Sequence, residues 1–295
     1  MNRKVKGIIY IVISSFFFAS MGMLVHQTGD LPFLQKSFFR NAVALIVAFI
    51  MLKKQHVSFR IEPGTRRYAF LRATFGTVSM VCNYYAIDRL PLSDASMLSK
   101  MSPFFAIVFS GIFLKEPVHK KQWFYICVAF IGSLFVLKPE MHTLVSFAAV
   151  VALIGGISSG FAQTMVRVLN CRHVPQWLII FCFSLMSCAV TLPFFIVFFV
   201  PMTLQQVLLL LAAGGTATIA QFCLTRAYYY AAASEISIYD YSQICFSAIL
   251  GYVFFHQLAD RWSYLGYLII AAAAIGMYFF NQKNSTVQAI EPDRR

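Results

Sequence analysis

Long apolar runs, separated by short polar connections, occupy almost the whole chain. A run of about 20 apolar residues forms a helix about 30 Å long, which is the thickness of the hydrocarbon core of a bilayer. The boundary near residues 232–235 is the least marked, so nine or eleven helices also fit the pattern. We predict an all-α polytopic membrane protein with about ten transmembrane helices, at residues 7–26, 33–52, 68–88, 93–114, 120–138, 144–166, 177–200, 205–226, 235–256 and 262–281.

The composition supports lipid as the main solvent of this chain. Of its 295 residues, 59% are hydrophobic and only 12% are charged, and the mean hydropathy is +0.71. A water-soluble fold of this length could not bury so much apolar surface. We therefore expect an integral protein of the membrane, with a bacterial cytoplasmic (inner) membrane as its location.

The basic residues predict the orientation of the helices. The net charge of +13 does not indicate a nucleic-acid partner, because the basic residues lie between apolar runs and not on one soluble face. Lys and Arg in short loops instead mark the cytoplasmic side. With a cytoplasmic N-terminus, sixteen of them fall in inner segments and only four fall outside, namely Lys36, Arg89, Lys138 and Arg261. Both chain termini are therefore expected in the cytoplasm.

Two parts of the sequence match when the chain is shifted by 141 positions. Identical residues then coincide at Ala86 and Ala227, Ser93 and Ser234, Ser96 and Ser237, Phe105 and Phe246, and Phe113 and Phe254. An odd number of helices in each copy inverts the second copy in the membrane, as in many secondary transporters. We predict two inverted five-helix repeats, residues 1–141 and 142–282, and a polar cytoplasmic tail at residues 283–295.

Short motifs lie at matching places in the two repeats. They occupy residues 86–95, 102–103 and 114–116 in the first repeat, and residues 226–228, 233–237, 241–243 and 251–257 in the second. With these motifs, nearly the whole chain resembles the drug/metabolite transporter superfamily, in its ten-helix group with paired EamA-type repeats. One departure is Gln257, where the family usually has a glutamate that matches Glu116.

The resemblance implies a particular architecture and activity. In this family the third, fourth, eighth and ninth helices, with the first and sixth, surround a central cavity. Members mostly move metabolites such as amino acids and their derivatives, commonly outward, and some import cofactors or nucleoside-like compounds. The resemblance therefore implies a transporter and not an enzyme, while the choice of solute does not follow from the fold.

Charged residues inside the predicted helices are candidates for solute contact, because a charge is costly in lipid. Lys100 falls roughly 10 Å from the outer surface and Asp240 roughly 9 Å from the inner one. In a hydrocarbon core about 30 Å thick, these depths leave roughly 11 Å between the two residues along the membrane normal. A direct ion pair is therefore not expected. We interpret the two as polar poles of one cavity, and the alternative is that each reaches toward its nearer surface. Arg40 fits packing as well as solute contact, and Arg226 better fits a topology signal.

Polar and aromatic residues complete the predicted site. Flat rings with hydrogen-bonding groups suit an organic cation or an amphiphilic metabolite, although aromatic residues also form packing contacts and interfacial belts. The predicted substrate-binding residues are Lys100, Asp240, Tyr85, Asn83, Ser99, Tyr239, Tyr241, Gln243 and Tyr228.

Together these features predict a secondary transporter that exports a small amphiphilic or cationic metabolite, such as an amino acid or a derivative, by alternating access. The rivals are a membrane-embedded enzyme for a lipid or isoprenoid and an importer of a nucleoside-like cofactor. H-E-x-x-H and Walker motifs are absent and the histidines are isolated, so we expect no metal, no cofactor and no ATP-driven step. The expected partners are the solute and the bilayer; a buried carboxylate permits proton coupling, and the oligomeric state stays open.

Overall fold

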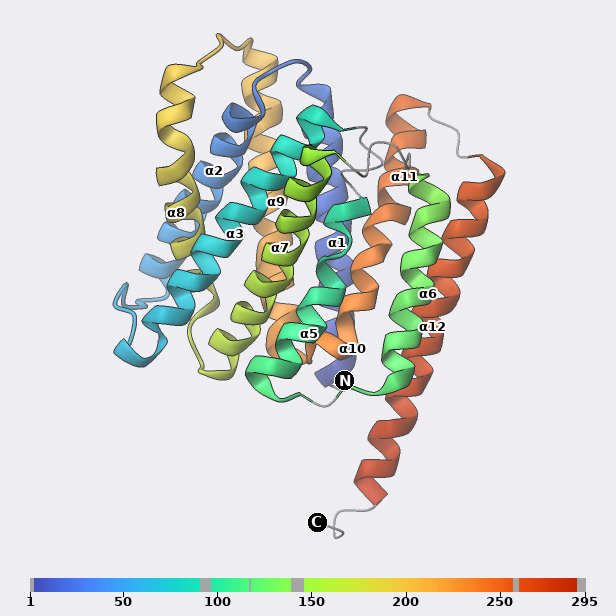
Figure 1. The fold of residues 1–295 in the computed structure, drawn as a ribbon. Coiled ribbons are helices and arrows are strands. Elements are labelled where there is room, and N and C mark those ends of the chain that lie inside the picture. The colour runs from blue at the N-terminus through green and yellow to red at the C-terminus, as the bar shows by residue number, and fades with distance from the viewer. Residues whose placement is uncertain (1–2, 91–96, 117, 139–145, 257–259, 291–295) are drawn as a thin grey trace.

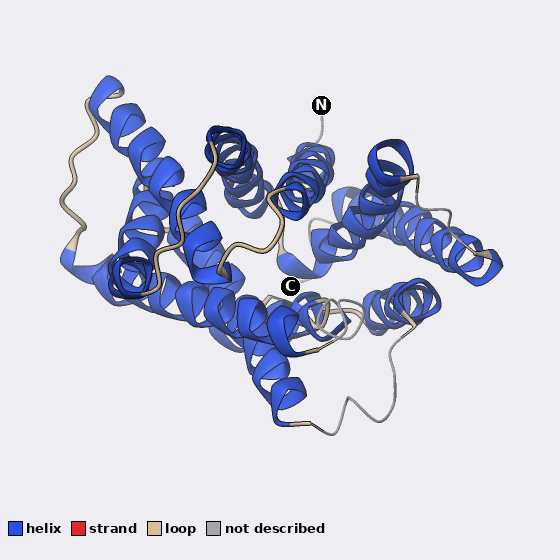
Figure 2. Ribbon diagram, turned by 90° about the horizontal axis from the view of Figure 1, so that it is seen from above, coloured by secondary structure: helices blue, strands red, loops and turns tan. Residues whose placement is uncertain are grey.

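The computed structural model describes residues 3–90, 97–116, 118–138, 146–256 and 260–290, and side chains throughout these ranges except at residues 87, 88 and 283–290. Within this part of the chain every regular element is a helix (Figures 1 and 2). The elements are α1 (Arg3–Gln27), α2 (Phe33–Lys54), α3 (Pro63–Arg89), α5 (Ser102–Leu114), α6 (Lys120–Leu137), α7 (Phe147–Cys171), α8 (Gln176–Val197), α9 (Leu204–Tyr230), α10 (Ala233–Ile236), the 3-10 helix η2 (Ser237–Tyr241), α11 (Ser242–Phe255) and α12 (Arg261–Ile290).

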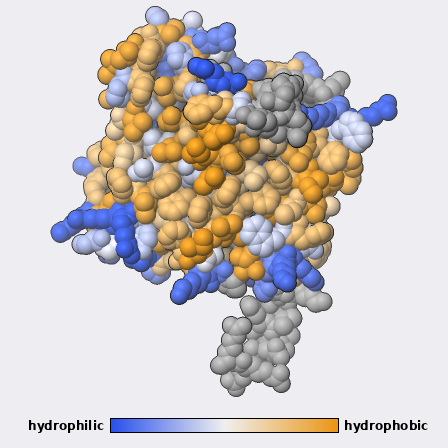
Figure 3. Space-filling view, viewed as in Figure 1, coloured by the Kyte–Doolittle hydropathy of each residue, from blue (hydrophilic) through white to orange (hydrophobic). Residues whose placement is uncertain are grey.

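The protein is a polytopic all-α membrane protein, as the apolar runs predict. Within the described residues, eight helical segments are long and apolar enough to cross a bilayer: α1, α2, Met97–Leu114, α6, α7, α8, α9 and the part Arg261–Gln282 of α12. Large apolar side chains such as Phe124 and Leu268 point away from the bundle. Figure 3 shows apolar side chains across the middle of one face and hydrophilic ones toward its ends.

The other two predicted spans coincide with α3 and α11. These helices do not match the eight segments in length or hydropathy, each for its own reason. α3 carries four arginines, at its ends and in its interior, which lowers its mean hydropathy. α11 has only 14 residues because its membrane segment is divided among α10, η2 and α11. At the C-terminal end, α12 continues to Ile290, so helix extends into the segment expected as a polar tail.

Helix lengths recur along the chain. α1 and α7 each have 25 residues, α2 and α8 each have 22, and α3 and α9 each have 27. The packing partners recur as well: α1 packs on α9 and α11, while α7 packs on α3 and α5. The pairs α2 with α8 and α6 with α12 lie at opposite sides of the bundle (Figure 1).

Two of the predicted spans contain a break in the helix among the described residues. The helical residues 97–99 end in a turn at Lys100 and Met101, and α5 then begins with Pro103 in its first turn. Pro fits there because its missing N–H would have no partner in the first turn of a helix. In the second case η2 separates α10 from α11 and ends at Tyr241. A 3-10 turn within a membrane helix often marks a functional site.

Glycines on α7 let neighbouring helices approach closely. A Cβ atom at Gly160 would lie 2.6 Å from Cβ of Phe105 and 2.7 Å from the backbone N of Ala106 on α5. At Gly156 it would lie 2.6 Å from the carbonyl oxygen of Leu98. Small residues at such crossings are typical of membrane helices, where close packing replaces the hydrophobic effect as the driving force.

We expect Gly160→Ala to destabilise the purified protein by about 1–3 kcal/mol, because the added methyl group meets backbone atoms that cannot move aside. The measurement is the midpoint of thermal unfolding in detergent. Gly111→Ala on α5 is the matched control, since nothing lies within 4 Å of its Cβ position. A Gly160→Ala midpoint equal to that of the control would contradict the close packing of α5 and α7.

Candidate functional site

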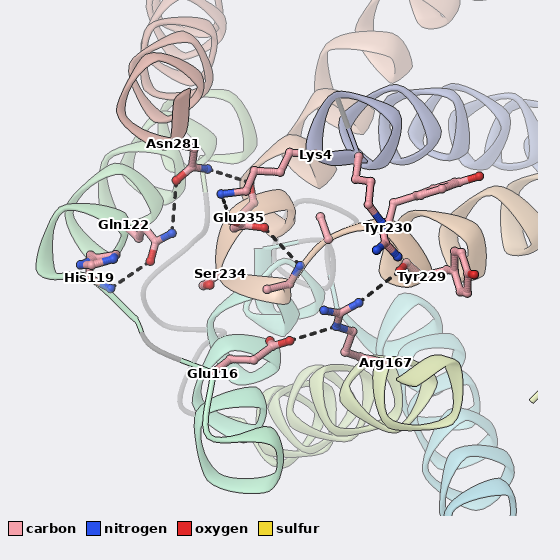
Figure 4. A pocket seen from close by; sticks show the side chains of 13 residues that line it. Lys4, Glu116, His119, Gln122, Arg167, Tyr229, Tyr230, Ser234, Glu235 and Asn281 are labelled. Atoms are coloured by element: carbon pink, nitrogen blue, oxygen red, sulfur yellow. Dashed lines mark hydrogen bonds and ion pairs between the residues drawn. The ribbon is translucent and has the colours of Figure 1, made fainter. Parts of the chain in front are cut away.

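A polar cavity of about 510 Å³ opens at the end of the bundle where the N-terminus lies (Figures 1 and 4). Its walls come from the beginning of α1, the α5–α6 connection, α6, α7, the α9–α10 connection and α12. The lining residues are Arg3, Lys4, Glu116, His119, Gln122, Arg167, Tyr229, Tyr230, Ala231, Ala232, Ser234, Glu235 and Asn281.

An ion pair between Glu116 and Arg167 forms one wall of the cavity. Nε of Arg167 lies 2.9 Å from Oε1 of Glu116, and both side chains are largely buried. The same guanidinium donates to the carbonyl oxygens of Tyr228, at 2.9 Å, and Tyr229, at 3.3 Å, near the end of α9. Ser110 donates to the other carboxylate oxygen of Glu116. The pair therefore ties α5 and α7 to α9.

A second ion pair, between Lys4 and Glu235, lies across the cavity from the first (Figure 4). Nζ of Lys4 on α1 is 2.5 Å from Oε1 of Glu235 on α10. Asn281 on α12 donates to the carbonyl oxygen of Glu235 at 3.3 Å and accepts from Gln122 on α6 at 3.3 Å. This network connects the N-terminal helix to α6, α10 and α12.

The two broken segments meet at Lys100 and Asp240. Nζ of Lys100 lies 3.0 Å from Oδ2 of Asp240, 3.2 Å from its carbonyl oxygen and 2.8 Å from Oε1 of Gln243. The hydroxyl of Tyr241 donates to the carbonyl oxygen of Lys100 at 2.9 Å. The side chains of Lys100 and Asp240 are 12% and 17% exposed, so the pair is largely desolvated.

This contact corrects the expectation that the two charges lie too far apart for an ion pair. The expectation assumed a continuous α-helical rise of about 1.5 Å per residue from each surface. In the structure Asp240 lies in a 3-10 turn, which rises about 2.0 Å per residue, and so reaches deeper. The long side chain of Lys100 closes the remaining distance.

The other predicted residues divide into three groups. Tyr241 and Gln243 contact Lys100 directly. Tyr228 is buried and its hydroxyl donates to Gln163 at 2.8 Å, and Tyr239 is buried with a hydroxyl that lacks a partner among the described residues. The contacts described for the structure do not join the remaining three to the ion pair: Tyr85 stacks on Arg89, and Asn83 and Ser99 are half-buried.

Sequence reasoning missed the two ion pairs at the cavity. Arg167 and Lys4 are among the sixteen basic residues counted above as cytoplasmic, because basic residues near helix ends usually mark that side of the membrane. Their partners, Glu116 and Glu235, belong to the motifs that carry the family resemblance. Their place in these motifs is the sequence signal that could have marked them as functional residues. An interior arginine, Arg72 on α3, was also missed, although any charge inside a predicted span is a candidate for function.

A bundle of membrane helices that contains a polar cavity and two broken helices is an architecture of secondary transporters. The sequence model of the EamA-like transporter family matches residues 5–138. A pseudopaline exporter of Pseudomonas aeruginosa is 32% identical over 92% of this chain and 95% of its own length. The chain therefore belongs to the EamA-like transporter family, within the drug/metabolite transporter superfamily, and is a transporter of small molecules.

More distant relatives carry different names. The riboflavin transporter of Vibrio cholerae is 23% identical over 96% of both chains. The S-adenosylmethionine uptake transporter of Rickettsia bellii is 23% identical over 83% of this chain and 82% of its own. A solved crystal structure with 14% identity has a TM-score of 0.79 and covers 91% of this chain and 95% of its own, which supports the fold alone.

We expect Arg167→Gln to lower the free energy of unfolding by about 2–3 kcal/mol, because it leaves the carboxylate of Glu116 without its cation in a partly screened site. Thermal unfolding of the purified protein measures this. The control is Arg172→Gln, which removes an exposed arginine stacked 4.5 Å from the Tyr68 ring. Equal stabilities for the two variants would show that the Glu116 pair contributes little.

Proposed function

We propose that the protein exports a small amphiphilic metabolite by alternating access, with Lys100 and Asp240 at the centre of the solute-binding site. The observation that carries this proposal is the ion pair formed where two broken helices meet. The cavity reaches Ser234 and Glu235 on α10, the short helix that leads directly into η2 and Asp240. A solute that enters the cavity would therefore have a short path to the pair.

The two charges favour a solute that carries charges of both signs. A desolvated ion pair gains little net free energy, because the loss of hydration offsets most of the attraction. A solute carboxylate could replace Asp240 beside Lys100, while a solute ammonium group pairs with Asp240. Such an exchange keeps every charge compensated, so it would open the pair at little cost. Amino acids and their derivatives meet this requirement.

The transport cycle would rely on movement between the two halves, residues 1–141 and 142–282. The recurring helix lengths and the exchanged packing partners support an inverted repeat of this kind. Contacts across the two breaks are few and polar, so they can be remade in a second arrangement. In that arrangement the cavity would close at the present end and open at the other.

Two considerations support export across the cytoplasmic membrane. If the basic connections lie in the cytoplasm, both termini and the cavity also face the cytoplasm, which is the side from which an exporter loads. The pseudopaline exporter, with 32% identity, transports outward by its name. Import is the second candidate, because relatives at 23% identity are named as an uptake transporter and a riboflavin transporter. Membership of a transporter family favours either carrier over a membrane-embedded enzyme.

We expect Asp240→Asn to reduce flux of the solute at least tenfold, since a neutral amide cannot pair with the cationic group of the solute. A thermal-shift screen of amino acids, polyamines, nucleosides and choline-like cations identifies a ligand, and flux of that ligand is then measured in proteoliposomes.

The matched control for Asp240→Asn is Asp260→Asn at the start of α12. Asp260 is exposed, and hydrogen bonds from Lys138 and Ser263 hold its pKa below the usual range, so it too carries a charge at neutral pH. Flux should be unchanged in this variant. Normal flux in purified Asp240→Asn would refute the role assigned to the ion pair.

The proposed orientation predicts the activity of C-terminal fusions. Green fluorescent protein fused after Arg295 should fluoresce, because it folds in the cytoplasm, whereas alkaline phosphatase at the same place should be inactive. Fusions after Lys138, at the end of α6, should give the opposite result. Active phosphatase at the C-terminus would place both termini outside and reverse the direction assigned to the cavity.

A further inference from the structure

A buried arginine, Arg72, lies in the interior of α3 and has no anionic partner among the described residues. The side chain of Arg72 is only 5% exposed, and its Nε atom has no hydrogen-bond partner among the described residues. Its guanidinium lies 4.3 Å from the centre of the Phe183 ring on α8. Arg72 lies four residues after the start of the span expected at 68–88, which is roughly 6 Å along the helix axis, so its charge falls within that span.

The absence of a side chain at Gly76 makes room for this guanidinium. Gly76 lies one helical turn after Arg72, on the same face of α3. A Cβ atom at Gly76 would lie 2.1 Å from one terminal nitrogen of Arg72 and 2.9 Å from the Phe183 ring. The arginine therefore occupies a fitted space between a glycine and an aromatic ring.

A second arginine increases the positive charge at this place. Arg40 on α2 is half-buried, lies 5.9 Å from the Phe18 ring of α1, and is close enough to Arg72 for their charges to repel. No ion pair joins either arginine to an acidic residue in the described parts of the chain.

Such a pair of charges requires an anion. A guanidinium stays protonated in proteins, so Arg72 cannot become neutral to escape the cost of burial. A cation–π contact offsets only part of the cost of an uncompensated buried charge. The planar fork of an arginine matches the two oxygens of a carboxylate.

We propose that Arg72, with Arg40 beside it, binds a carboxylate of the transported solute. The inference rests on the proposed transport function and specifies its solute as a metabolite that bears an acidic group. Gly76 and Phe183 hold the guanidinium in place. The burial of the Arg72 side chain, which is only 5% exposed, favours a solute over a lipid head group as the source of the anion.

The test is binding of a simple carboxylate to detergent-purified, full-length protein. Thermal unfolding is measured in sodium succinate, in its neutral analogue succinamide with sodium chloride, and in sodium chloride alone, all at equal ionic strength. Succinate should raise the midpoint above both other conditions, because a ligand that prefers the folded state stabilises it. Isothermal titration then gives the affinity.

Variants assign the binding to Arg72. Arg72→Gln should weaken succinate binding at least tenfold, and Arg72→Lys should retain part of it. Gly76→Ala keeps the charge but crowds the guanidinium, so it should also weaken binding. This second variant tests the proposal if Arg72→Gln fails to fold. Arg172→Gln, which removes an exposed arginine stacked on an aromatic ring, should bind succinate normally.

Several outcomes would overturn the proposal. One is that succinate does not raise the unfolding midpoint of the wild-type protein. A second is that chloride raises it equally, which would indicate an inorganic counter-ion. A third is that Arg72→Gln binds succinate as tightly as the wild-type protein does. Stabilisation by added phosphatidylglycerol but not by succinate would identify a lipid head group instead. Because binding is measured without flux, intact succinate binding in a protein that exports nothing would contradict only the export proposal.

Discussion

A polypeptide in lipid must satisfy its own backbone hydrogen bonds, and this requirement governs where the helices of this protein can break. No water is present in the hydrocarbon core to replace a lost partner. At the two breaks, side chains take over: the hydroxyl of Tyr241 donates to the carbonyl oxygen of Lys100, Lys100 donates to that of Asp240, and Ser242 donates to that of Tyr239. Contacts between the two breaks therefore help to stabilise both, and the same contacts hold the charged groups of the centre.

The distribution of charge follows from the same absence of water. Three acidic residues, Glu116, Glu235 and Asp240, pair with basic ones on different helices. Each pair thereby connects elements that a transport cycle would have to separate. Pairs of this kind add little net stability but are costly to break singly. They are therefore suited to hold one arrangement of the helices until a charged solute offers an alternative partner.

The family shares a fold across solutes that differ by name, from pseudopaline to riboflavin. Specificity must then depend on a few polar groups within a common helical frame. Among the described residues, the interior charges include the Lys100–Asp240 ion pair and the two arginines Arg40 and Arg72. Under the two proposals above, these groups would favour a solute with an acidic group over a simple organic cation.

The sequence by itself determined the solvent, the helical class and the approximate position of each helix, because these depend on local apolar runs that lipid requires. It also marked Lys100 and Asp240 as central residues, since charges inside such runs are conspicuous. Their contact was not predictable: the two residues are 140 positions apart, and their depth depends on a 3-10 turn whose geometry the hydrophobic pattern does not reveal. Only the tertiary structure decided which charges find a partner of opposite sign, because packing, and not the local sequence, brings a residue of another helix into contact. Among the described residues, Arg167 has such a partner and Arg72 does not.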